Sequence, residues 1–139
     1  MFYTGITRNA SNILKEQDQN TRENRSKQDT MKQMVQSVSI LKDELENNRL
    51  DHFGAILHEN WLLKKEMARG VSNIEIDSWY DTAIRCGAQG GKILGAGGGG
   101  FLLFYVPEEK QESVRKGLSF LREIPFAFEN EGSKIIFIH

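Results

Sequence analysis

The chain has 139 residues, of which 39% are hydrophobic and 27% charged, a size and composition that suit one globular domain. The 18 Lys and Arg residues balance 19 Asp and Glu residues, and the net charge of -1 argues against partners such as nucleic acid or an anionic membrane. Cys86 is the only cysteine, which excludes an intramolecular disulfide and a cysteine-based zinc site and favours a reducing, cytoplasmic location. No apolar run approaches the ~18 residues of a membrane span.

The first half of the chain has the composition of long helices. Between residues 9 and 69 there is no proline and a single glycine, Gly54, and polar, turn-prone residues interrupt the pattern at 26–30 and at 47–48. We therefore expect helices over residues 9–27, 30–46 and 49–69.

The second of these helices has an apolar stripe. Its hydrophobic residues recur at i, i+3, i+4 and i+7, which predicts a face packed against the core of its own domain, with a groove for a partner as the alternative. Residues 15–29 carry eight charges and no large apolar residue, so we expect a solvated face there, with contact to another segment as the alternative. The stripe consists of Met31, Met34, Val35, Val38, Leu41 and Leu45.

A fourth helix and several strands follow. Ser72 and Glu75 have the spacing of a capping box, and the helical period then runs to Gly87, a typical C-terminal stop. Short apolar runs predict strands over residues 1–7, 92–94 and 101–106 and a hairpin of 125–129 with 134–138, while residues 108–120 read as a helix. The sum is an α+β domain with a small, mostly antiparallel sheet of about four strands backed by helices.

Five of the six residues from Gly95 to Gly100 are glycine, which disfavours folding unless the backbone needs their conformational freedom. Such a run either bends tightly beneath another element or directs several N–H groups into one concavity that suits an anion such as phosphate. A Walker A motif is excluded, because Cys86 and Ile93 stand where it needs glycine and Ser or Thr. A dinucleotide-binding turn is excluded because a strand follows the loop. The packed bend and the anion cradle both stay open.

Residues 87–101, with the sequence GAQGGKILGAGGGGF, resemble the third signature motif of the GHMP kinases, the superfamily of galactokinase, homoserine kinase, mevalonate kinase and phosphomevalonate kinase. Residues 3–8, 61–65 and 71–77 resemble the subgroup that phosphorylates D-glycero-D-manno-heptose 7-phosphate. The resemblance extends over essentially all 139 residues and implies that residues 1–139 form one domain, of the C-terminal, ferredoxin-like type found in this family.

The family's N-terminal domain carries an ATP loop of the form P-x-x-x-G-[LI]-[GS]-S-S-[AS]. Here the only prolines are Pro107 and Pro125, and no Ser-Ser pair occurs, so this domain is expected to be missing from the chain. The resemblance implies that the complete enzyme uses ATP and Mg²⁺ to phosphorylate the anomeric hydroxyl of a sugar phosphate, heptose 7-phosphate. We expect the chain alone to bind no cofactor, to be inactive, and to self-associate through the exposed interdomain face. A stand-alone binding or regulatory module is the alternative.

The resemblance also implies site residues. Arg8 and Lys92 are expected to contact substrate phosphate or to hold the loop, and Lys64 and Lys65 to reach a sugar phosphate, with a solvated helix end as the alternative for these lysines. No catalytic residue is assigned, and no metal ligand, since His52 and His58 lack the i, i+4 spacing of a metal pair. The loop expected to lie against the reacting phosphates is Gly95, Ala96, Gly97, Gly98, Gly99 and Gly100.

Replacing Gly97 and Gly98 with valine tests this role of the loop. We expect the double replacement to lower turnover strongly and to leave the fold largely intact.

Overall fold

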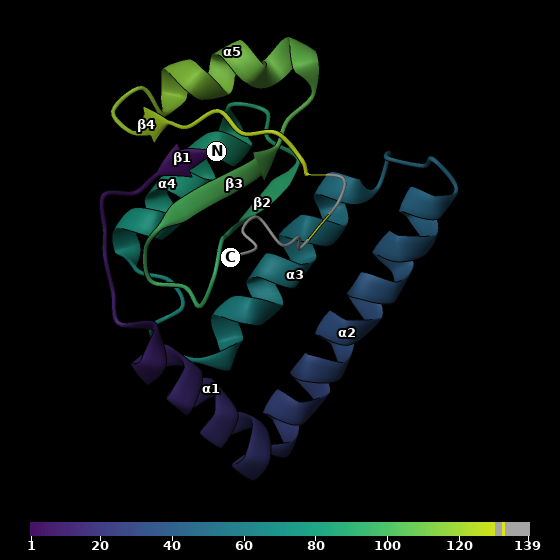
Figure 1. Ribbon diagram of the computed structural model, residues 1–139, viewed down its shortest axis with the longest axis vertical. Coiled ribbons are helices and arrows are strands. Elements are labelled where there is room, and N and C mark those ends of the chain that lie inside the picture. Colours follow the sequence, from purple (N-terminus) through teal and green to yellow (C-terminus); the bar gives the residue numbers. More distant parts are fainter. Residues whose placement is uncertain (130–131, 133–139) are drawn as a thin grey trace, which may run out of the picture.

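The computed structural model describes residues 1–129 and 132. Helices dominate the first half of this part of the chain and strands enter mainly in the second half (Figure 1). None of the described helices is long and apolar enough to cross a membrane. In chain order the elements are β1 (Phe2–Tyr3), α1 (Ala10–Glu23), α2 (Arg25–Glu46), α3 (Phe53–Met67), α4 (Ile74–Arg85), β2 (Gly90–Ile93), β3 (Phe101–Tyr105), α5 (Glu108–Gly117) and β4 (Arg122–Glu123).

The strands form one antiparallel sheet in the order β2-β3-β1-β4. The predicted α+β class, with a small antiparallel sheet backed by helices, is confirmed. The prediction of a strand over residues 125–129 is wrong, because the fourth strand is β4, immediately before it. The last bond along this edge runs from Ile124 N to Met1 O (2.8 Å), and Pro125 has no N–H with which to continue the ladder. The partner strand expected at 134–138 lies outside the described residues.

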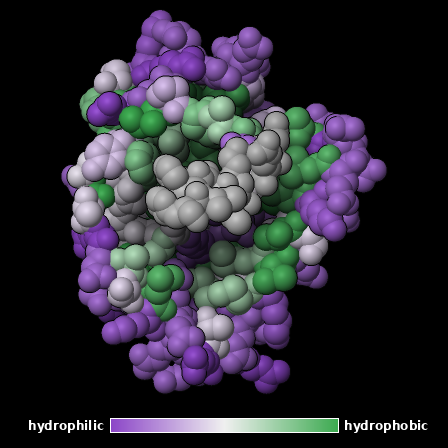
Figure 2. Space-filling model, viewed as in Figure 1, coloured by the Kyte–Doolittle hydropathy of each residue, from purple (hydrophilic) through white to green (hydrophobic). Residues whose placement is uncertain are grey.

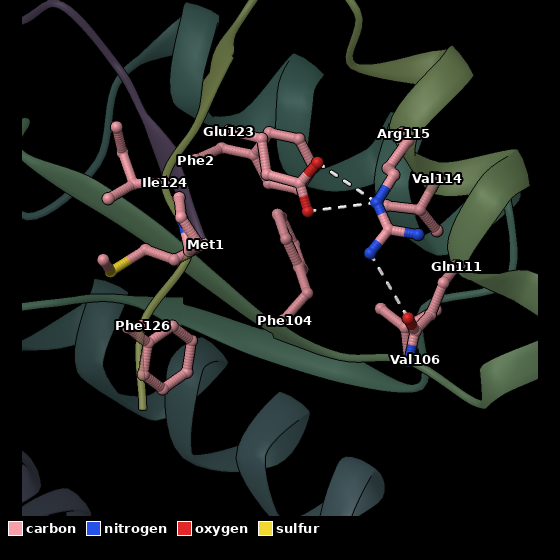
Figure 3. Close-up of a pocket in the computed structure, with 11 residues that line it drawn as sticks. Met1, Phe2, Phe104, Val106, Gln111, Val114, Arg115, Glu123, Ile124 and Phe126 are labelled. Carbon is pink, nitrogen blue, oxygen red and sulfur yellow. Dashed lines mark hydrogen bonds and ion pairs between the residues drawn. The ribbon is translucent and has the colours of Figure 1, made fainter. Parts of the chain in front are cut away.

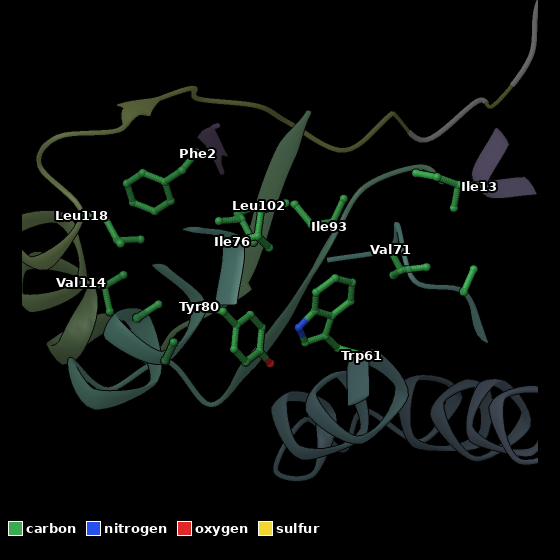
Figure 4. Packing of buried hydrophobic residues seen from close by; sticks show 13 residues of the cluster. Phe2, Ile13, Trp61, Val71, Ile76, Tyr80, Ile93, Leu102, Val114 and Leu118 are labelled. Atoms are coloured by element: carbon green, nitrogen blue, oxygen red, sulfur yellow. The ribbon is translucent and has the colours of Figure 1, made fainter. Parts of the chain in front are cut away.

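One face of the sheet carries the hydrophobic core, which is shown in Figure 4. On β3 the side chains alternate, and Leu102 and Phe104 share the face that α4 and α5 cover. The Phe104 ring lies 6.2 Å from the ring of Phe2 and 5.6 Å from that of Tyr80, between centroids. Helix α4 buries Ile76, Tyr80 and Ala83 in this core, and α5 and its C-cap residue bury Val114 and Leu118.

Helix α3 lies along β2, the edge strand of the sheet (Figure 1). Two glycines allow this close approach. A Cβ atom built on Gly90 would come within 1.9 Å of Gly54 O, and one built on Gly54 within 2.4 Å of Gln89 Cβ. No other residue fits at either position without moving the helix from the strand. The contact brings the C-terminal end of α3 to the glycine loop that follows β2.

The break between the first two helices is shorter than expected. We predicted an interruption at residues 26–30, but α1 ends at Glu23 and α2 begins at Arg25, with Asn24 as the only residue between them. The Asn24 side chain accepts hydrogen bonds from the backbone N–H groups of Ser26 (3.0 Å) and Lys27 (3.4 Å), while its own N–H donates to Asn20 O (3.0 Å). A single Asn therefore caps both helices, which is why no longer turn is needed.

The prediction that the α2 stripe is core is wrong for its outer members. Val35, Val38 and Leu45 are 60%, 64% and 46% exposed. The helix instead packs on α3 through a neighbouring face, on which Thr30 is buried and the carbonyl of Met34 accepts a hydrogen bond from Asn60 Nδ2 at 3.3 Å. The i, i+3, i+4 rule identifies an amphipathic helix but does not fix which part of a wide apolar face is covered.

Part of the polar first helix contacts another segment, which was the alternative to a solvated face. Asn20 Nδ2 donates to Met67 O (2.8 Å), and Glu16 Oε1 accepts from Arg69 N (3.0 Å). Both contacts fix the end of α3 and the start of the linker that follows it.

Candidate functional site at the glycine loop

The glycine loop, residues 95–100, joins β2 to β3 and is held by two other stretches of backbone. From one side, Gly100 N donates to Ile6 O (2.9 Å), and Gly100 O accepts from both the N–H and the hydroxyl of Thr4 (2.9 Å each). From the other side, Gly98 N donates to Val71 O at 2.8 Å. The loop is therefore clamped between residues 4–8 and the α3–α4 linker, residues 68–73.

These contacts explain the glycines individually. Gly97 has φ +116°, and a Cβ there would lie 2.7 Å from the backbone of Val71. Gly98 has φ +74°, with a Cβ position 2.7 Å from Gly70 O, and a Cβ on Gly99 would come within 2.4 Å of Ile6 O. The packed-bend interpretation thus holds for this half of the loop. The expectation that valine at Gly97 and Gly98 leaves the fold intact is wrong, because both positions abut backbone.

The first half of the loop is more open. A Cβ built on Gly95 would meet nothing within 4 Å, and Gly95 is exposed while Ala96 and Gly97 are half-buried. Within the described part of the chain, the N–H groups of Gly95, Ala96 and Gly97 donate no hydrogen bond. Successive free N–H groups in a turn with positive φ angles are the backbone arrangement that suits an anion. The loop therefore combines a packed half and a half that can accept a ligand.

Three cationic side chains lie around this loop. Lys64, from the last turn of α3, donates a hydrogen bond from Nζ to Gly95 O. Its pKa is lowered from the usual value, first by burial and then by the positive charge of Lys92 on β2, which places the two lysines close together. Arg8 comes from the opposite side, with its Cγ 3.6 Å from the Cβ position of Gly98. None of the three forms an ion pair with a described residue, so no described carboxylate compensates their charge.

The fourth predicted cation is placed differently. Lys65 Nζ lies 3.1 Å from Asp77 Oδ1, in the first turn of α4, and the same carboxylate oxygen accepts the hydroxyl hydrogen bond of Ser72 at 2.8 Å. The predicted capping box is wrong, because Asn73 caps α4 by accepting from Ile76 N (2.9 Å) and Ser72 turns to Asp77 instead. No pattern along the sequence shows these contacts, since they depend on three segments meeting.

A cavity lies elsewhere, between α5 and the β1 and β4 strands (Figure 3). It has a volume of about 420 Å³, and its one cationic side chain is Arg115, with the N-terminal amine of Met1 also in the lining. That guanidinium is already bound, with Nε 3.0 and 3.1 Å from the two carboxylate oxygens of Glu123 and an amino group 3.3 Å from Gln111 Oε1. The rest of the lining is mainly apolar, including Phe2, Phe104 and Phe126.

A second hollow, of about 410 Å³, lies between α2 and α3, and its one charged lining residue is Glu59, whose negative charge would repel a phosphate. In Figure 2 the edges of the molecule at α5 and α1 are hydrophilic, and hydrophobic residues gather between them. In residues 1–129 and 132 no group of three His, Cys, Asp or Glu side chains is placed to hold a metal ion. The glycine loop is therefore the part of the described structure best suited to phosphate.

The comparisons with known proteins agree with this geometry. Residues 41–122, more than half of the chain, match the family model "GHMP kinases C terminal". The chain is 31% identical over 138 residues to D-glycero-alpha-D-manno-heptose 7-phosphate kinase of Campylobacter jejuni, covering 96% of this chain and 40% of the relative. It is 28% identical over 116 residues to L-fucokinase/L-fucose-1-P guanylyltransferase of Bacteroides fragilis, covering 83% of this chain and 12% of that protein.

A solved structure shows the same fold. Mevalonate kinase of L. major, in complex with R-mevalonate, matches with a TM-score of 0.75 and 21% identity, over 86% of this chain and 36% of that one. This likeness shows the fold, and the family model shows the class of protein. The chain belongs to the GHMP kinase family and corresponds to its C-terminal domain. It spans about two fifths or less of the length of each of these three proteins.

Proposed function

We propose that this chain is the substrate-side domain of an ATP-dependent sugar-phosphate kinase, which transfers the γ-phosphoryl group of ATP to the anomeric hydroxyl of heptose 7-phosphate. The choice of heptose 7-phosphate rests on the relative from Campylobacter jejuni, the more similar of the two curated proteins above. The observation that carries the proposal is the loop itself, in which free N–H groups lie beside three cations with no acidic partner.

In this proposal the open half of the loop and the side chains of Arg8, Lys64 and Lys92 hold phosphate oxygens and neutralise charge that spreads over them during transfer. On binding, the Lys64 ammonium would either give up its hydrogen bond to the Gly95 carbonyl for one to a phosphate oxygen, or keep that bond and hold the loop against the phosphate. A half-buried ammonium, such as that of Lys64, gains more from a bound anion than a fully exposed one, because water competes less for it.

The proposal requires a second domain. No Mg²⁺ ligand is assigned to the described residues, which hold no cluster of three metal-ligating side chains, and Asp77, in the first turn of α4, is bound by Lys65 and Ser72. We infer that an N-terminal kinase domain grips ATP and supplies the metal site and the catalytic residues, that the complete enzyme works in the cytoplasm, and that this chain alone is inactive. Self-association of the chain stays a prediction.

A phosphoryl-transfer assay with Mg-ATP tests the proposal, using this chain alone and then the protein extended by an N-terminal kinase domain. Heptose 7-phosphate, fucose and mevalonate serve as acceptors. We expect turnover only in the extended protein and only with the heptose phosphate. Turnover with fucose alone would show that fucose, and not heptose 7-phosphate, is the acceptor. No turnover in the extended protein with any of the three acceptors would favour a non-catalytic binding module.

Gly95→Ala is the sharpest variant for the loop. The alanine methyl group meets no atom within 4 Å, so its main structural effect is the strain of a positive φ, +86°. Gly132→Ala introduces a comparable strain, at φ +67° with nothing within 4 Å, in a later segment of the chain and serves as the matched control. We expect turnover to fall about tenfold or more for Gly95→Ala alone; equal activity in the two variants would remove the loop from the site.

A further inference from the structure

The α3–α4 linker carries a polar contact that the proposed phosphate site does not use. One carboxylate oxygen, Asp77 Oδ1, receives both the Lys65 ammonium at 3.1 Å and the Ser72 hydroxyl at 2.8 Å. Lys65 belongs to α3, Ser72 to the linker and Asp77 to α4. We call these three residues the linker clamp.

The clamp contributes little to the overall stability. The side chains of Lys65 and Asp77 are 30% and 44% exposed, and partly exposed ion pairs contribute about 0–1 kcal/mol. Four other ion pairs in the described residues join neighbouring turns of one helix, such as Lys42 with Glu46, and do not link separate elements. The linker clamp joins α3, α4 and the linker between them, so its main effect is to fix where the linker lies.

The position that it fixes is that of Val71. Val71 is next to Ser72, is fully buried, and has its N–H bonded to Ala68 O at 3.3 Å. Its carbonyl accepts the Gly98 N–H at 2.8 Å, and its backbone lies 2.7 Å from the Cβ position of Gly97. A shift of Ser72 therefore moves the carbonyl that holds the middle of the glycine loop.

We propose that Lys65, Ser72 and Asp77 are positioning residues that set the geometry of the glycine loop through the Val71 carbonyl. Lys64 and Lys65, adjacent on α3, then act on the loop in two places. Lys64 contacts its first residue directly, whereas Lys65 fixes its middle through the linker. The kinetic part of this inference rests on the proposed function, since a misplacement of about 1 Å at a phosphoryl-transfer site lowers turnover about 100-fold.

The structural part is tested on this chain without any assay of activity. Amide hydrogen exchange, measured by NMR, reports directly on the Gly98 N–H. We expect Asp77→Asn and Ser72→Ala each to speed Gly98 exchange by at least about tenfold, while the exchange of core amides in β3 stays unchanged. Ser72→Thr keeps the hydroxyl and is expected to restore protection.

Arg115→Met is the matched control. It removes an ion pair with Glu123 that also joins two elements and has similar side-chain exposure, 45% and 42%, but lies at α5, away from the loop. Gly98 exchange that is unchanged in both clamp variants, or that rises equally in Arg115→Met, overturns the inference. If Asp77→Asn does not fold, Ser72→Ala decides.

Kinetics of the extended protein separate this inference from the proposed function. If both hold, the clamp variants lower kcat about tenfold or more with a smaller change in KM, and Ser72→Thr restores kcat. If the unmodified extended protein has no activity, the proposed function fails and the exchange data still decide the clamp. If exchange rises while kcat is unchanged, the kinetic part fails and the structural part stands.

Discussion

The two ends of the β2–β3 hairpin differ in how their charges are used. At the loop end, Arg8, Lys64 and Lys92 have no acidic partner among the described residues, and backbone N–H groups are free beside them. At the other end, the α5 pocket has a volume of about 420 Å³, but its one cationic side chain, Arg115, is bound by Glu123 and Gln111. The comparison teaches that unpaired charge, more than hollow space, distinguishes the glycine loop as the candidate site.

Among the variants that test this comparison, the largest effect should come from filling the packed half of the loop. Gly97→Val places a branched side chain at φ +116° and 2.7 Å from the Val71 backbone. Strain and overpacking together should lower the free energy of unfolding by about 3 kcal/mol. Urea denaturation measures this loss. Gly95→Ala, in the open half, should lose about 1 kcal/mol, and equal losses would contradict the division of the loop into two halves.

Neutralising the cations should separate the two ends functionally. Lys92→Met or Arg8→Met in the extended protein should raise the KM for one of the phosphorylated substrates about tenfold, because a charged hydrogen bond to phosphate contributes roughly 1.5 kcal/mol or more. Arg115→Met, at the paired end, should leave KM unchanged. Steady-state kinetics with each substrate varied in turn measure these KM values. A tenfold rise in KM for Arg115→Met would indicate that the substrate binds at the α5 pocket instead.

Between the two ends, Tyr80 ties α4 to β2 and α3. Its hydroxyl lies 2.9 Å from His58 Nδ1 and donates to Gly91 O at 3.4 Å, and burial, the largest cause, raises its pKa to about 12. A raised pKa means that the folded chain keeps the neutral phenol while the unfolded chain ionises near pH 10. This contribution to stability is complete below pH 10 and is lost between about pH 10 and 12.

Tyr80→Phe tests that account. At neutral pH the free energy of unfolding should fall by about 1 kcal/mol, the usual contribution of a buried hydrogen bond. Between pH 10 and 12 the unmodified chain should lose up to about 1.4 kcal/mol more per pH unit than the variant. Denaturation curves at several pH values measure both quantities. Parallel pH profiles would show that Tyr80 ionises as readily in the folded chain as in the unfolded one.

The smallest effect is expected on the exposed part of α2. Val38 is 64% exposed, so Val38→Lys should change the free energy of unfolding by no more than about 0.5 kcal/mol. Leu118, fully buried on α5, provides the contrast, and Leu118→Ala should lose about 2–5 kcal/mol. Thermal or urea unfolding of both variants gives the comparison. A large loss of unfolding free energy for Val38→Lys would indicate that the α2 stripe is part of the core after all.

Local patterns predicted much of the fold. The stop at Gly87 (φ +109°), the strand at 101–106 and the helix at 108–120 follow from turn chemistry and short-range periodicity, and the structure has them as the end of α4, as β3 and as α5. The face of α2 could not be predicted, since α3 decides which part of a wide apolar stripe is covered. The expected role of the loop and of its cations followed from the family resemblance, and the structure adds the contacts that hold them in place.

The linker clamp lies beyond any single-sequence pattern. Ser72, with Glu75 three residues on, satisfies a capping rule, and only the approach of Lys65 from α3 shows that Asp77 is its partner. The contacts of Thr4 and Ile6 could not be predicted either, because nothing in the N-terminal segment indicates that it binds a loop about 95 residues further along the chain.

The N-terminal segment is needed to hold the glycine loop, so the domain cannot be shortened to the residues that the family model matches. The family model begins at residue 41, yet the carbonyl that receives the Gly100 N–H belongs to Ile6, and Arg8 lies two residues further on. A polypeptide trimmed to residues 41–122 would keep every glycine of the loop and both lysines of α3, but it would lack one wall of the loop and one of its three cations. Truncation experiments on this domain should therefore retain the first eight residues.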